Sequence, residues 1–337
     1  MSKYSKIYVL TPYNYCTGGV ELSHQLVSRL RDCGEDAYVV YAKPPLSISE
    51  DQNVTPNYAS YNIKTTDIIE DEAYNFLVLP EVYFEYIKLY KRINIGCWWM
   101  SVDNRYRRSC LKDSLSFTTN IVSKLKLVYS YLISSYKYTN SNSEIQREGD
   151  RVINLYQSHY AQYHLYSKGF GRLAPLSDYI NLELVKEIGG EREDIVLYNP
   201  VKGKEFTERV MNRLPDVRFV PLKGLNRKEL QQLLGKAKLY IDFGHFPGKD
   251  RLPREAVVNG CCIITGKLGA SFFYEDVPIH SAYKFECKKK NLPKIVEKIK
   301  FVLSNYDTCS KEFDDYRRIV LNEKNKFFCE IDELFCK

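Results

Sequence analysis

The sequence lacks any run of about 18 consecutive apolar residues, so we expect no transmembrane helix. It also lacks an apolar stretch with a small-residue cleavage site near its start, and we therefore expect no export signal. The 49 Lys and Arg against 42 Asp and Glu leave a net charge of +7. The basic residues are not gathered in one long tract. This balance argues against a histone-like binder, but it is compatible with anionic small molecules or an anionic membrane surface.

The ten cysteines form no CxxC pair and no spacing typical of a zinc site. In the absence of an export signal, we interpret them as reduced thiols in a cytoplasmic protein. Most of them are expected to be buried as small apolar side chains.

What the sequence has is a repeated alternation of short apolar runs and segments of helical periodicity. A length of 337 residues, at roughly 150 per domain, corresponds to about two domains. The predicted strands cover residues 7–10, 37–41, 75–79, 93–99, 152–156, 194–198, 217–220, 239–243 and 261–265. Helices are predicted between them, among others at 227–237 and 254–259. Short continuous apolar strands are typical of buried parallel sheets.

The alternation predicts an α/β fold with two doubly wound, Rossmann-like domains facing each other across a cleft. We place the first domain at residues 1–172 and the second at 173–308. The helix-like segment 309–337 is expected to pack back on the first domain. Ligands of such sheets bind beyond the carboxyl ends of the strands, and the unusual residues of this sequence fall there.

The first candidate segment is the turn that contains Gly18, Gly19 and Glu21, between a predicted strand and a predicted helix. Two glycines leave room for a ligand, and the start of the helix offers unpaired N–H groups. The alternative is a tight turn that binds nothing.

The second candidate segment is 199–204, directly after the first strand of the second domain. It contains Asn199, Lys202 and Lys204. A lysine at the carboxyl end of a strand can neutralise a diphosphate as a point charge. Surface lysines in a loop are common, however, and they are the alternative interpretation.

The third candidate segment, 245–260, joins a loop rich in charge to a short helix that ends at Gly260. A carboxylate in such a place can accept hydrogen bonds from both hydroxyls of a ribose, while cations bind phosphates. The alternative is a solvated loop that precedes a helix. The candidate ligand contacts in this segment are Gly248, Lys249, Asp250, Arg251, Arg254 and Glu255.

In this order, the three segments resemble the retaining GT-B glycosyltransferases of the glycosyltransferase-4 type. Residues 213–242 are also similar to the sugar-nucleotide domain of that family. The resemblance implies a GT-B fold and transfer of a sugar from a nucleotide-activated donor with retention of configuration. It further implies that neither a metal nor another cofactor is needed, and the candidate segments contain no Asp-x-Asp pair.

The resemblance assigns Glu255 to the second acid of the family's E-x7-E element, which grips the ribose of the nucleotide. Eight residues earlier, where the family has its first Glu, this sequence has Pro247. That acid normally meets the donor sugar, so either Asp250 or another nearby group replaces it, or the donor is unusual.

Lys202 matches the family's diphosphate-binding lysine, with Lys204 as the alternate. The arginine that often accompanies this lysine is not obvious, and Lys249 or Arg251 would supply its charge. Asn199 precedes the lysine in the same segment and belongs to the expected donor site.

Four shorter segments resemble parts of bacterial surface-polysaccharide glycosyltransferases and imply capsule or lipopolysaccharide assembly, with a glycan or lipid-linked acceptor. They are residues 79–81, 98–104, 156–161 and 176–180. Glu81 and Asp103 in these segments follow predicted strands, where a carboxylate can orient an acceptor hydroxyl. Both could instead cap helices.

Residues 105–140 contain seven Lys or Arg and one acid, interleaved with aromatic residues. Ile121, Leu125, Val128 and Leu132 recur at helical spacing, which would let the segment lie on an anionic bilayer at the inner face of the cytoplasmic membrane. Ser and Thr dilute this pattern, so we favour a helix that packs on its own sheet with its lysines outward. No nucleic-acid-binding element accompanies the basic residues, and we expect no nucleic acid as partner.

Two other functions are compatible with these residues. A GT-B epimerase or hydrolase of nucleotide sugars would need acid and base residues beside the donor sugar. A degenerate sugar-nucleotide-binding protein without catalysis is the other, and Pro247 is its main support.

Overall fold

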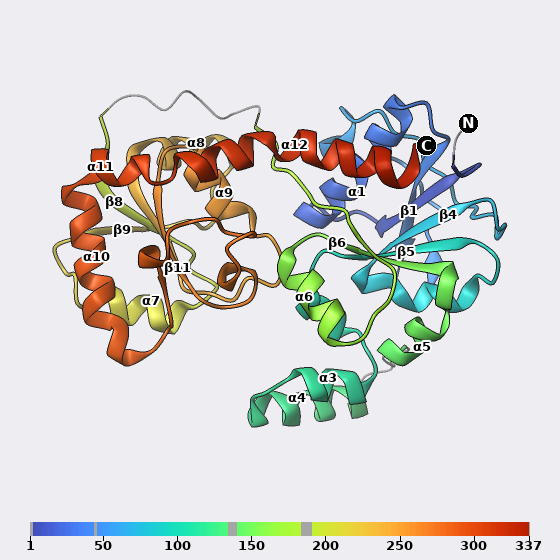
Figure 1. The fold of residues 1–337 in the computed structure, drawn as a ribbon, viewed down its shortest axis with the longest axis horizontal. Helices are drawn as coiled ribbons and strands as arrows, with labels where there is room; N and C mark the ends of the chain where they lie inside the picture. The colour runs from blue at the N-terminus through green and yellow to red at the C-terminus, as the bar shows by residue number, and fades with distance from the viewer. Residues whose placement is uncertain (1–2, 44–45, 134–139, 183–190, 337) are drawn as a thin grey trace. The chain divides into compact units, whose positions relative to one another are not determined.

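The computed structural model describes residues 3–43, 46–133, 140–182 and 191–336. The chain divides into two compact units (Figure 1). Unit 1 comprises Met1–Asp178 together with Lys326–Lys337, and unit 2 comprises Tyr179–Asn325. Each unit is built on one sheet flanked by helices, which confirms the predicted α/β class with two Rossmann-like domains.

The sheet of unit 1 has the strand order β3-β2-β1-β4-β5-β6-β7. All neighbouring strands pair in parallel except β2 and β3. The strands are β1 (Ile7–Pro12), β2 (Ala37–Lys43), β3 (Ser47–Ile48), β4 (Phe76–Pro80), β5 (Asn94–Trp99), β6 (Val152–Tyr156) and β7 (Leu173–Pro175). The helices are α1 (Gly18–Asp32), α2 (Val102–Arg107), α3 (Leu111–Phe117), α4 (Ile121–Ile133), α5 (Asn142–Arg147), α6 (His159–Ser167) and the 3-10 helices η1 (Pro56–Tyr58), η2 (Glu81–Leu89) and η3 (Gly149–Arg151).

The central strands of unit 1 are buried along most of their length, as their continuous apolar runs predict. On β5, Gly96 fits because any side chain there would collide with its neighbours. A Cβ atom at Gly96 would lie 2.8 Å from both Leu155 and Phe76. The glycine therefore lets large side chains of β4 and β6 close over the middle of the sheet.

The sheet of unit 2 has the order β12-β11-β10-β8-β9, and all of its strands are parallel. The strands are β8 (Glu193–Tyr198), β9 (Arg218–Pro221), β10 (Ala237–Asp242), β11 (Cys262–Gly266) and β12 (Lys284–Phe285). The helices are α7 (Lys204–Met211), α8 (Arg227–Lys236), α9 (Arg251–Val258), α10 (Leu292–Ser304), α11 (Tyr306–Lys311), α12 (Asp314–Phe335) and the 3-10 helices η4 (Ala270–Phe272), η5 (Ser281–Tyr283) and η6 (Lys289–Asn291).

Helix α12 begins in unit 2 and contributes its last residues to unit 1. There Asp332 accepts two hydrogen bonds from Arg29, at 2.9 and 2.7 Å. The ring of Phe335 lies edge-on to Phe76, with 5.4 Å between the ring centroids. These contacts tie the end of the chain to α1 and to the sheet of unit 1.

Each sheet has one point at which the chain reverses its direction of winding. In unit 1 this switch point lies between β1 and β4, because β2 is on one side of β1 and β4 on the other. In unit 2 it lies between β8 and β10 for the same reason. Doubly wound sheets bind ligands in the crevice outside the carboxyl ends of the strands at such points. The residues that follow these four strands are therefore the candidates for function.

Two sequence-based expectations are wrong. Only four of the ten free cysteines are buried, namely Cys97, Cys261, Cys262 and Cys309. Helix α4 does not pack its apolar face on the sheet, since none of its residues is buried.

Tyr136 and Tyr138 of the basic aromatic stretch lie outside the described residues. Within the described part of the chain, no helix has the length and apolar character needed to cross a membrane.

Candidate functional site

At the switch point of unit 2, two loops approach each other so closely that glycine is required in both. Gly203, after β8, has a φ angle of 64°, and a Cβ atom there would lie 2.5 Å from the carbonyl carbon of Phe243. Gly244, after β10, would place a Cβ atom 2.3 Å from the Cβ atom of Lys202. The two glycines therefore allow Lys202 to lie directly beside the end of β10.

Lys202 joins the loop after β8 to the loop that leads into α9. Its ammonium donates a hydrogen bond of 2.6 Å to Oδ2 of Asp250. The backbone N–H of Lys202 donates to Oδ1 of Asn199, at 3.1 Å, and this bond fixes the turn. Burial raises the pKa of Asp250 above its usual range, although the ammonium of Lys202 acts in the opposite direction. The structure thus brings three sequence-predicted donor-site residues together.

Asp242, the last residue of β10, belongs to the same cluster and was missed by the sequence reasoning. Its carboxylate accepts hydrogen bonds from the hydroxyl of Tyr240 at 2.9 Å and from the N–H of Gly244 at 2.8 Å. The side-chain amide of Asn199 donates to it at 3.3 Å. Burial raises the pKa of Asp242 to about 6. An acid at the end of an apolar strand, just before the candidate loop, was the signal that could have revealed it.

Two helices begin at this edge of the sheet. Gly203 is the N-cap of α7 and has no side chain to cap the helix, and the side chain of Asp250, the N-cap of α9, accepts no hydrogen bond from its helix. The first N–H groups of a helix and its positive dipole end favour an anion. Together with Lys202, the two helix starts make this edge suitable for a phosphate group.

Lys249 and Arg254 anchor the loop between β10 and α9 from within. Lys249 donates to Glu323 at 2.7 Å, and Arg254, which is 1% exposed, donates to the other oxygen of Glu323 at 2.8 Å. Arg254 also donates to the backbone carbonyl of Lys249 at 3.2 Å. Lys249 therefore shares the buried carboxylate of α12 with Arg254 and points into the protein.

The remaining predicted residues of unit 2 lie on the first turns of α7 and α9 or beside them. Glu255 is one turn after Arg251 on α9, with 3.8 Å between the carboxylate and the guanidinium. Lys204 is 67% exposed and lies 3.7 Å from Glu208, one turn along α7. Lys202, and not Lys204, is thus the lysine that contacts Asp250. Gly248 lies in the loop that leads to Asp250.

The equivalent edge of unit 1 holds a buried carboxyl group. Glu81 directly follows β4 and accepts a hydrogen bond from the N–H of Met100 at 3.3 Å. Burial raises the pKa of Glu81 to about 7. Asp103, in the first turn of α2, accepts a hydrogen bond of 3.4 Å from the hydroxyl of Tyr160. Both predicted acids therefore lie beyond the carboxyl ends of neighbouring strands, β4 and β5.

The glycine turn of unit 1 forms the start of α1. A Cβ atom at Gly19 would lie 3.7 Å from the side chain of Met100, which is ordinary contact, so packing alone does not require this glycine. Glu21 accepts a hydrogen bond of 3.1 Å from the hydroxyl of Tyr61. Gly18 is the first residue of the helix. The turn is close to Met100, which also contacts Glu81.

A possible metal-ligand group lies elsewhere in unit 1. Within the described residues, Cys33, Asp332 and Cys336 have one ligand atom each within 4.8 Å of one another. Arg29 already donates two hydrogen bonds to Asp332, which offsets the negative charge that would attract a cation. No sequence spacing could reveal this group, because Cys33 lies at the opposite end of the unit's sequence.

No family model matches the sequence, and no curated protein matches it. Several solved structures are similar to the chain in fold. Sucrose-phosphate synthase from Thermosynechococcus elongatus has a TM-score of 0.63 at 11% identity, and the match covers 98% of both chains. HepE of Anabaena, in complex with UDP and glucose, has a TM-score of 0.60 at 11% identity, over 98% of this chain and 99% of that one.

TarM of S. aureus, in complex with UDP and alpha-GlcNAc-glycerol, is similar over a smaller part of its length. Its TM-score is 0.53 at 12% identity, over 78% of this chain. The present chain spans only 55% of the TarM chain. All three are GT-B glycosyltransferases, and at such low identity the similarity concerns the fold. The two doubly wound units therefore constitute a GT-B fold, as the sequence predicted.

Proposed function

We propose that the protein transfers a sugar from a nucleotide-activated donor to a glycan or lipid-linked acceptor during the synthesis of a bacterial surface polysaccharide, capsule or lipopolysaccharide. The observation that carries this proposal is the cluster of Lys202, Asp242 and Asp250 at the switch point of unit 2. The GT-B fold, shared with glycosyltransferases that were solved with UDP or a UDP-sugar, supports it. A UDP-sugar is accordingly the first donor to test.

Donor binding begins with the diphosphate. Its negative charge takes the place of the Asp250 carboxylate as the partner of the Lys202 ammonium, and the N–H groups at the starts of α7 and α9 donate to its oxygens. Glu255, on the first turns of α9, accepts hydrogen bonds from the ribose hydroxyls. Asp250, once released from Lys202, is free to contact the donor sugar in place of the acid that Pro247 replaces.

The transfer step exchanges one carbon–oxygen bond for another. The bond between the anomeric carbon and the diphosphate oxygen breaks, the acceptor hydroxyl bonds to that carbon on the same face, and the hydroxyl proton goes to a leaving phosphate oxygen. Lys202 and the two helix starts stabilise the charge that develops on the diphosphate. This route needs no protein nucleophile and no metal ion, so we propose a retaining, metal-independent reaction.

We assign acceptor binding to the carboxyl edge of the sheet in unit 1. Glu81, whose pKa burial raises to about 7, is present in both protonation states near neutral pH and can either donate to or accept from an acceptor hydroxyl. Asp103 is the second carboxylate at this edge. The proposed reaction takes place in the cytoplasm, where nucleotide sugars are available to a protein of this kind.

Thermal unfolding in the presence of nucleotides tests the proposal. The panel consists of UDP, GDP, ADP, TDP and CMP and their sugar derivatives. A ligand at 100 times its dissociation constant should stabilise the folded protein by about 2.7 kcal/mol. We expect one nucleotide to stabilise the wild type, and Lys202→Ala and Glu255→Ala to lose that shift. Lys204→Ala is the matched control and should retain it. No shift with any member of the panel would contradict the proposal.

Hydrolysis or epimerisation of a nucleotide sugar is a second candidate, because it needs acid and base residues beside the donor sugar. Asp242 and Asp250 both have raised pKa values and lie next to Lys202, as that chemistry would require. Product analysis separates the candidates. A transferase yields a sugar joined to the acceptor, a hydrolase yields free sugar, and an epimerase yields an altered donor. A degenerate binding protein would show the thermal shift without any of these products.

A further inference from the structure

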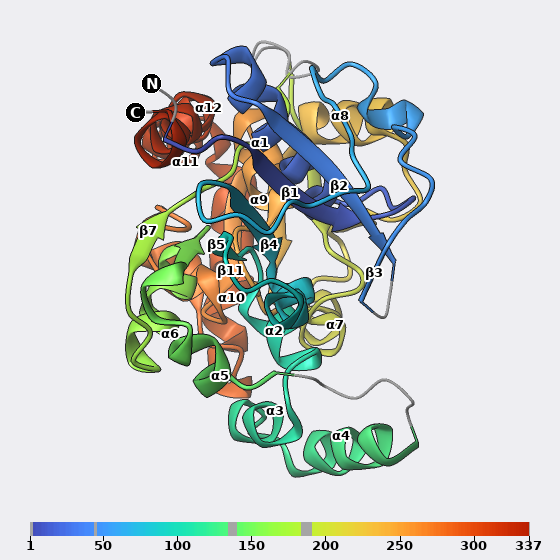
Figure 2. The ribbon, with the colours of Figure 1, turned by 90° about the vertical axis from the view of Figure 1, so that its right-hand side faces the viewer.

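Helices α3 and α4 form an excursion of unit 1 between β5 and β6. Both views show α4 at the periphery of the unit, with α3 beside it (Figures 1 and 2). The structure describes α4 over Ile121–Ile133, and none of these residues is buried. The helix therefore contributes little to the core of its own unit.

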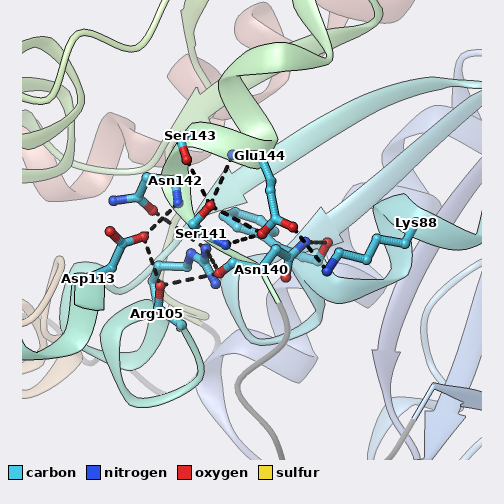
Figure 3. Close-up of polar contacts among 10 residues, drawn as sticks. Lys88, Arg105, Asp113, Asn140, Ser141, Asn142, Ser143 and Glu144 are labelled. Atoms are coloured by element: carbon cyan, nitrogen blue, oxygen red, sulfur yellow. Dashed lines mark hydrogen bonds and ion pairs between the residues drawn. The ribbon is translucent and has the colours of Figure 1, made fainter. Parts of the chain in front are cut away.

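The excursion starts and ends at one well-anchored point (Figure 3). The N–H of Cys110 donates to the carbonyl of Asn140 at 3.2 Å, so the two ends of the excursion meet. The buried guanidinium of Arg105 donates to the same carbonyl at 2.9 Å. The N–H of Asn142 donates to the carboxylate of Asp113 at 2.6 Å. The base is thus held by a polar network, while α4 itself has no buried residue.

The outward face of α4 is apolar. Ile121, Leu125 and Leu132 are 69%, 65% and 76% exposed. At roughly 100° per residue along a helix, they lie within about 40° of one another. The same exposed face continues to Tyr129, Val122 and Ile133. Large apolar side chains gathered on one exposed face mark an interaction site in a folded protein.

The charges around this face identify its partner. Helix α4 contains no acidic residue, and its two lysines, Lys124 and Lys126, fall on opposite sides of the apolar arc. The single acid of the excursion, Asp113, is engaged by Asn142 at the base. An apolar face with a lysine on each side matches the boundary between acyl chains and anionic headgroups. A second copy of this helix would instead bring lysines of the same charge together.

We propose that α4 docks this protein on an anionic lipid bilayer. The apolar residues enter the upper acyl region, and Lys124 and Lys126 contact the lipid phosphates. Thirteen residues give a helix of about 20 Å, which lies in the plane of the interface and does not span it. This docking goes beyond the proposed function, since it requires no nucleotide sugar. If both hold, a lipid-linked acceptor and the enzyme share one surface.

Vesicle flotation with the full-length protein tests the docking. The vesicles are neutral phosphatidylcholine, or phosphatidylcholine with about one third phosphatidylglycerol, at low and high salt. We expect binding to the anionic vesicles that weakens with salt. Each of Leu125→Ser and Leu132→Ser should lower the partition coefficient roughly tenfold. The pair Lys124→Gln and Lys126→Gln should lower it by tenfold or more on anionic vesicles.

Ile68→Ser is the matched control, because Ile68 has the same exposed fraction as Leu125, 65%, but lies outside the excursion. It should bind vesicles like the wild type. Since none of the altered side chains of α4 is buried, circular dichroism and the unfolding temperature should stay unchanged in all variants. Failure of the wild type to float with anionic vesicles would overturn the proposal. Equal loss in Ile68→Ser, or a dimer in solution that Leu125→Ser dissociates, would overturn it as well. None of these outcomes depends on transferase activity.

Discussion

The two sheets share a switch-point layout, but the chemistry at their carboxyl edges differs. In unit 2, the residues after β8 and β10 combine a cation with carboxylates, as Lys202 pairs with Asp250 beside Asp242. In unit 1, the residue after β4 is Glu81, a buried acid that accepts hydrogen bonds from amide groups such as the N–H of Met100. The first edge suits a phosphate, and the second suits a neutral group such as a hydroxyl. The shared switch-point layout thus leaves the chemistry to a few loop residues.

The edges also differ in how they are stabilised. The loop before α9 depends on a buried ion cluster, in which the Glu323 carboxylate of α12 pairs with both Lys249 and Arg254. Glu81 is held by its position between β4 and the start of α2. A charged cluster needs every partner, whereas a single buried acid can lose its charge by taking up a proton. Substitutions at the two edges should therefore have different signatures.

The largest effect is expected at Glu323. Glu323→Ala leaves the buried guanidinium of Arg254 without its carboxylate, which should lower the free energy of unfolding by about 3–5 kcal/mol. Urea denaturation measures this loss. Glu333→Ala, an exposed position on the same helix, is the control and should change stability by less than about 0.5 kcal/mol. Equal effects of the two substitutions would show that the buried cluster does not support the loop.

Glu81 should make the free energy of unfolding depend on pH. Its pKa in the folded protein is about 7, above the ordinary value of 4.5, so the folded state binds the proton more tightly than the unfolded state. Stability should therefore fall as the pH rises from 4.5 to 7, by an amount on the order of 3 kcal/mol. Glu81→Gln should remove this contribution, so that the variant gains stability relative to the wild type between pH 5 and pH 8. Urea denaturation at both pH values measures the difference, and Glu333→Gln should show none.

Alanine substitutions at two glycines, Gly244 and Gly235, compare a position in close contact with one that has open space around it. Gly244→Ala would put a Cβ atom 2.3 Å from that of Lys202, so the loops after β8 and β10 must separate. We expect a loss of about 1–3 kcal/mol in stability and weaker binding of the nucleotide. At Gly235, on α8, a Cβ atom meets nothing within 4 Å, and Gly235→Ala should stabilise by about 0.5–1 kcal/mol. A Gly244→Ala variant with unchanged stability would contradict the close approach of the two loops.

Most of the fold could be predicted because parallel strands leave a strong signal. The strand predicted at 152–156 is β6, and those predicted at 194–198 and 217–220 differ from β8 and β9 by one residue at their ends. A buried parallel strand is apolar over its whole length, and turn residues bound it. The predicted packing of helix α4 was wrong because its sequence signal is ambiguous. Its apolar periodicity is that of a packed helix, but the sequence does not say whether the partner is the protein's own sheet or something outside it.

The site could be predicted in part. The charged loop and the segment around Lys202 were visible as unusual residues at the ends of strands. The pairing of Lys202 with Asp250, two residues 48 positions apart, was not visible, because it depends on two glycines that bring the loops together. The role of Glu323 was hidden for a similar reason. This carboxylate comes from α12, far along the chain, to neutralise a lysine that the sequence assigned to the ligand.

The smallest effect is expected from a substitution of Asp250. It tests whether the Lys202 ammonium binds a phosphate of the ligand. Asp250→Asn removes the carboxylate that competes with the ligand for the ammonium. Because the pair is partly exposed, its release should tighten the binding of a nucleoside diphosphate by only about two- to fivefold, as measured by calorimetry. Turnover of the complete nucleotide sugar should fall if Asp250 also contacts the donor sugar.

Glu208→Gln gives the matched comparison, since it frees Lys204 in the same way on the exposed face of α7. If Lys202 is the phosphate ligand, Glu208→Gln should leave the affinity unchanged while Asp250→Asn raises it. Weaker binding in Asp250→Asn would mean that the carboxylate positions Lys202 for the ligand and does not compete for it. Tighter binding in Glu208→Gln alone would move the phosphate from Lys202 to Lys204, and the comparison between the partly exposed Lys202 and the more exposed Lys204 would be reversed.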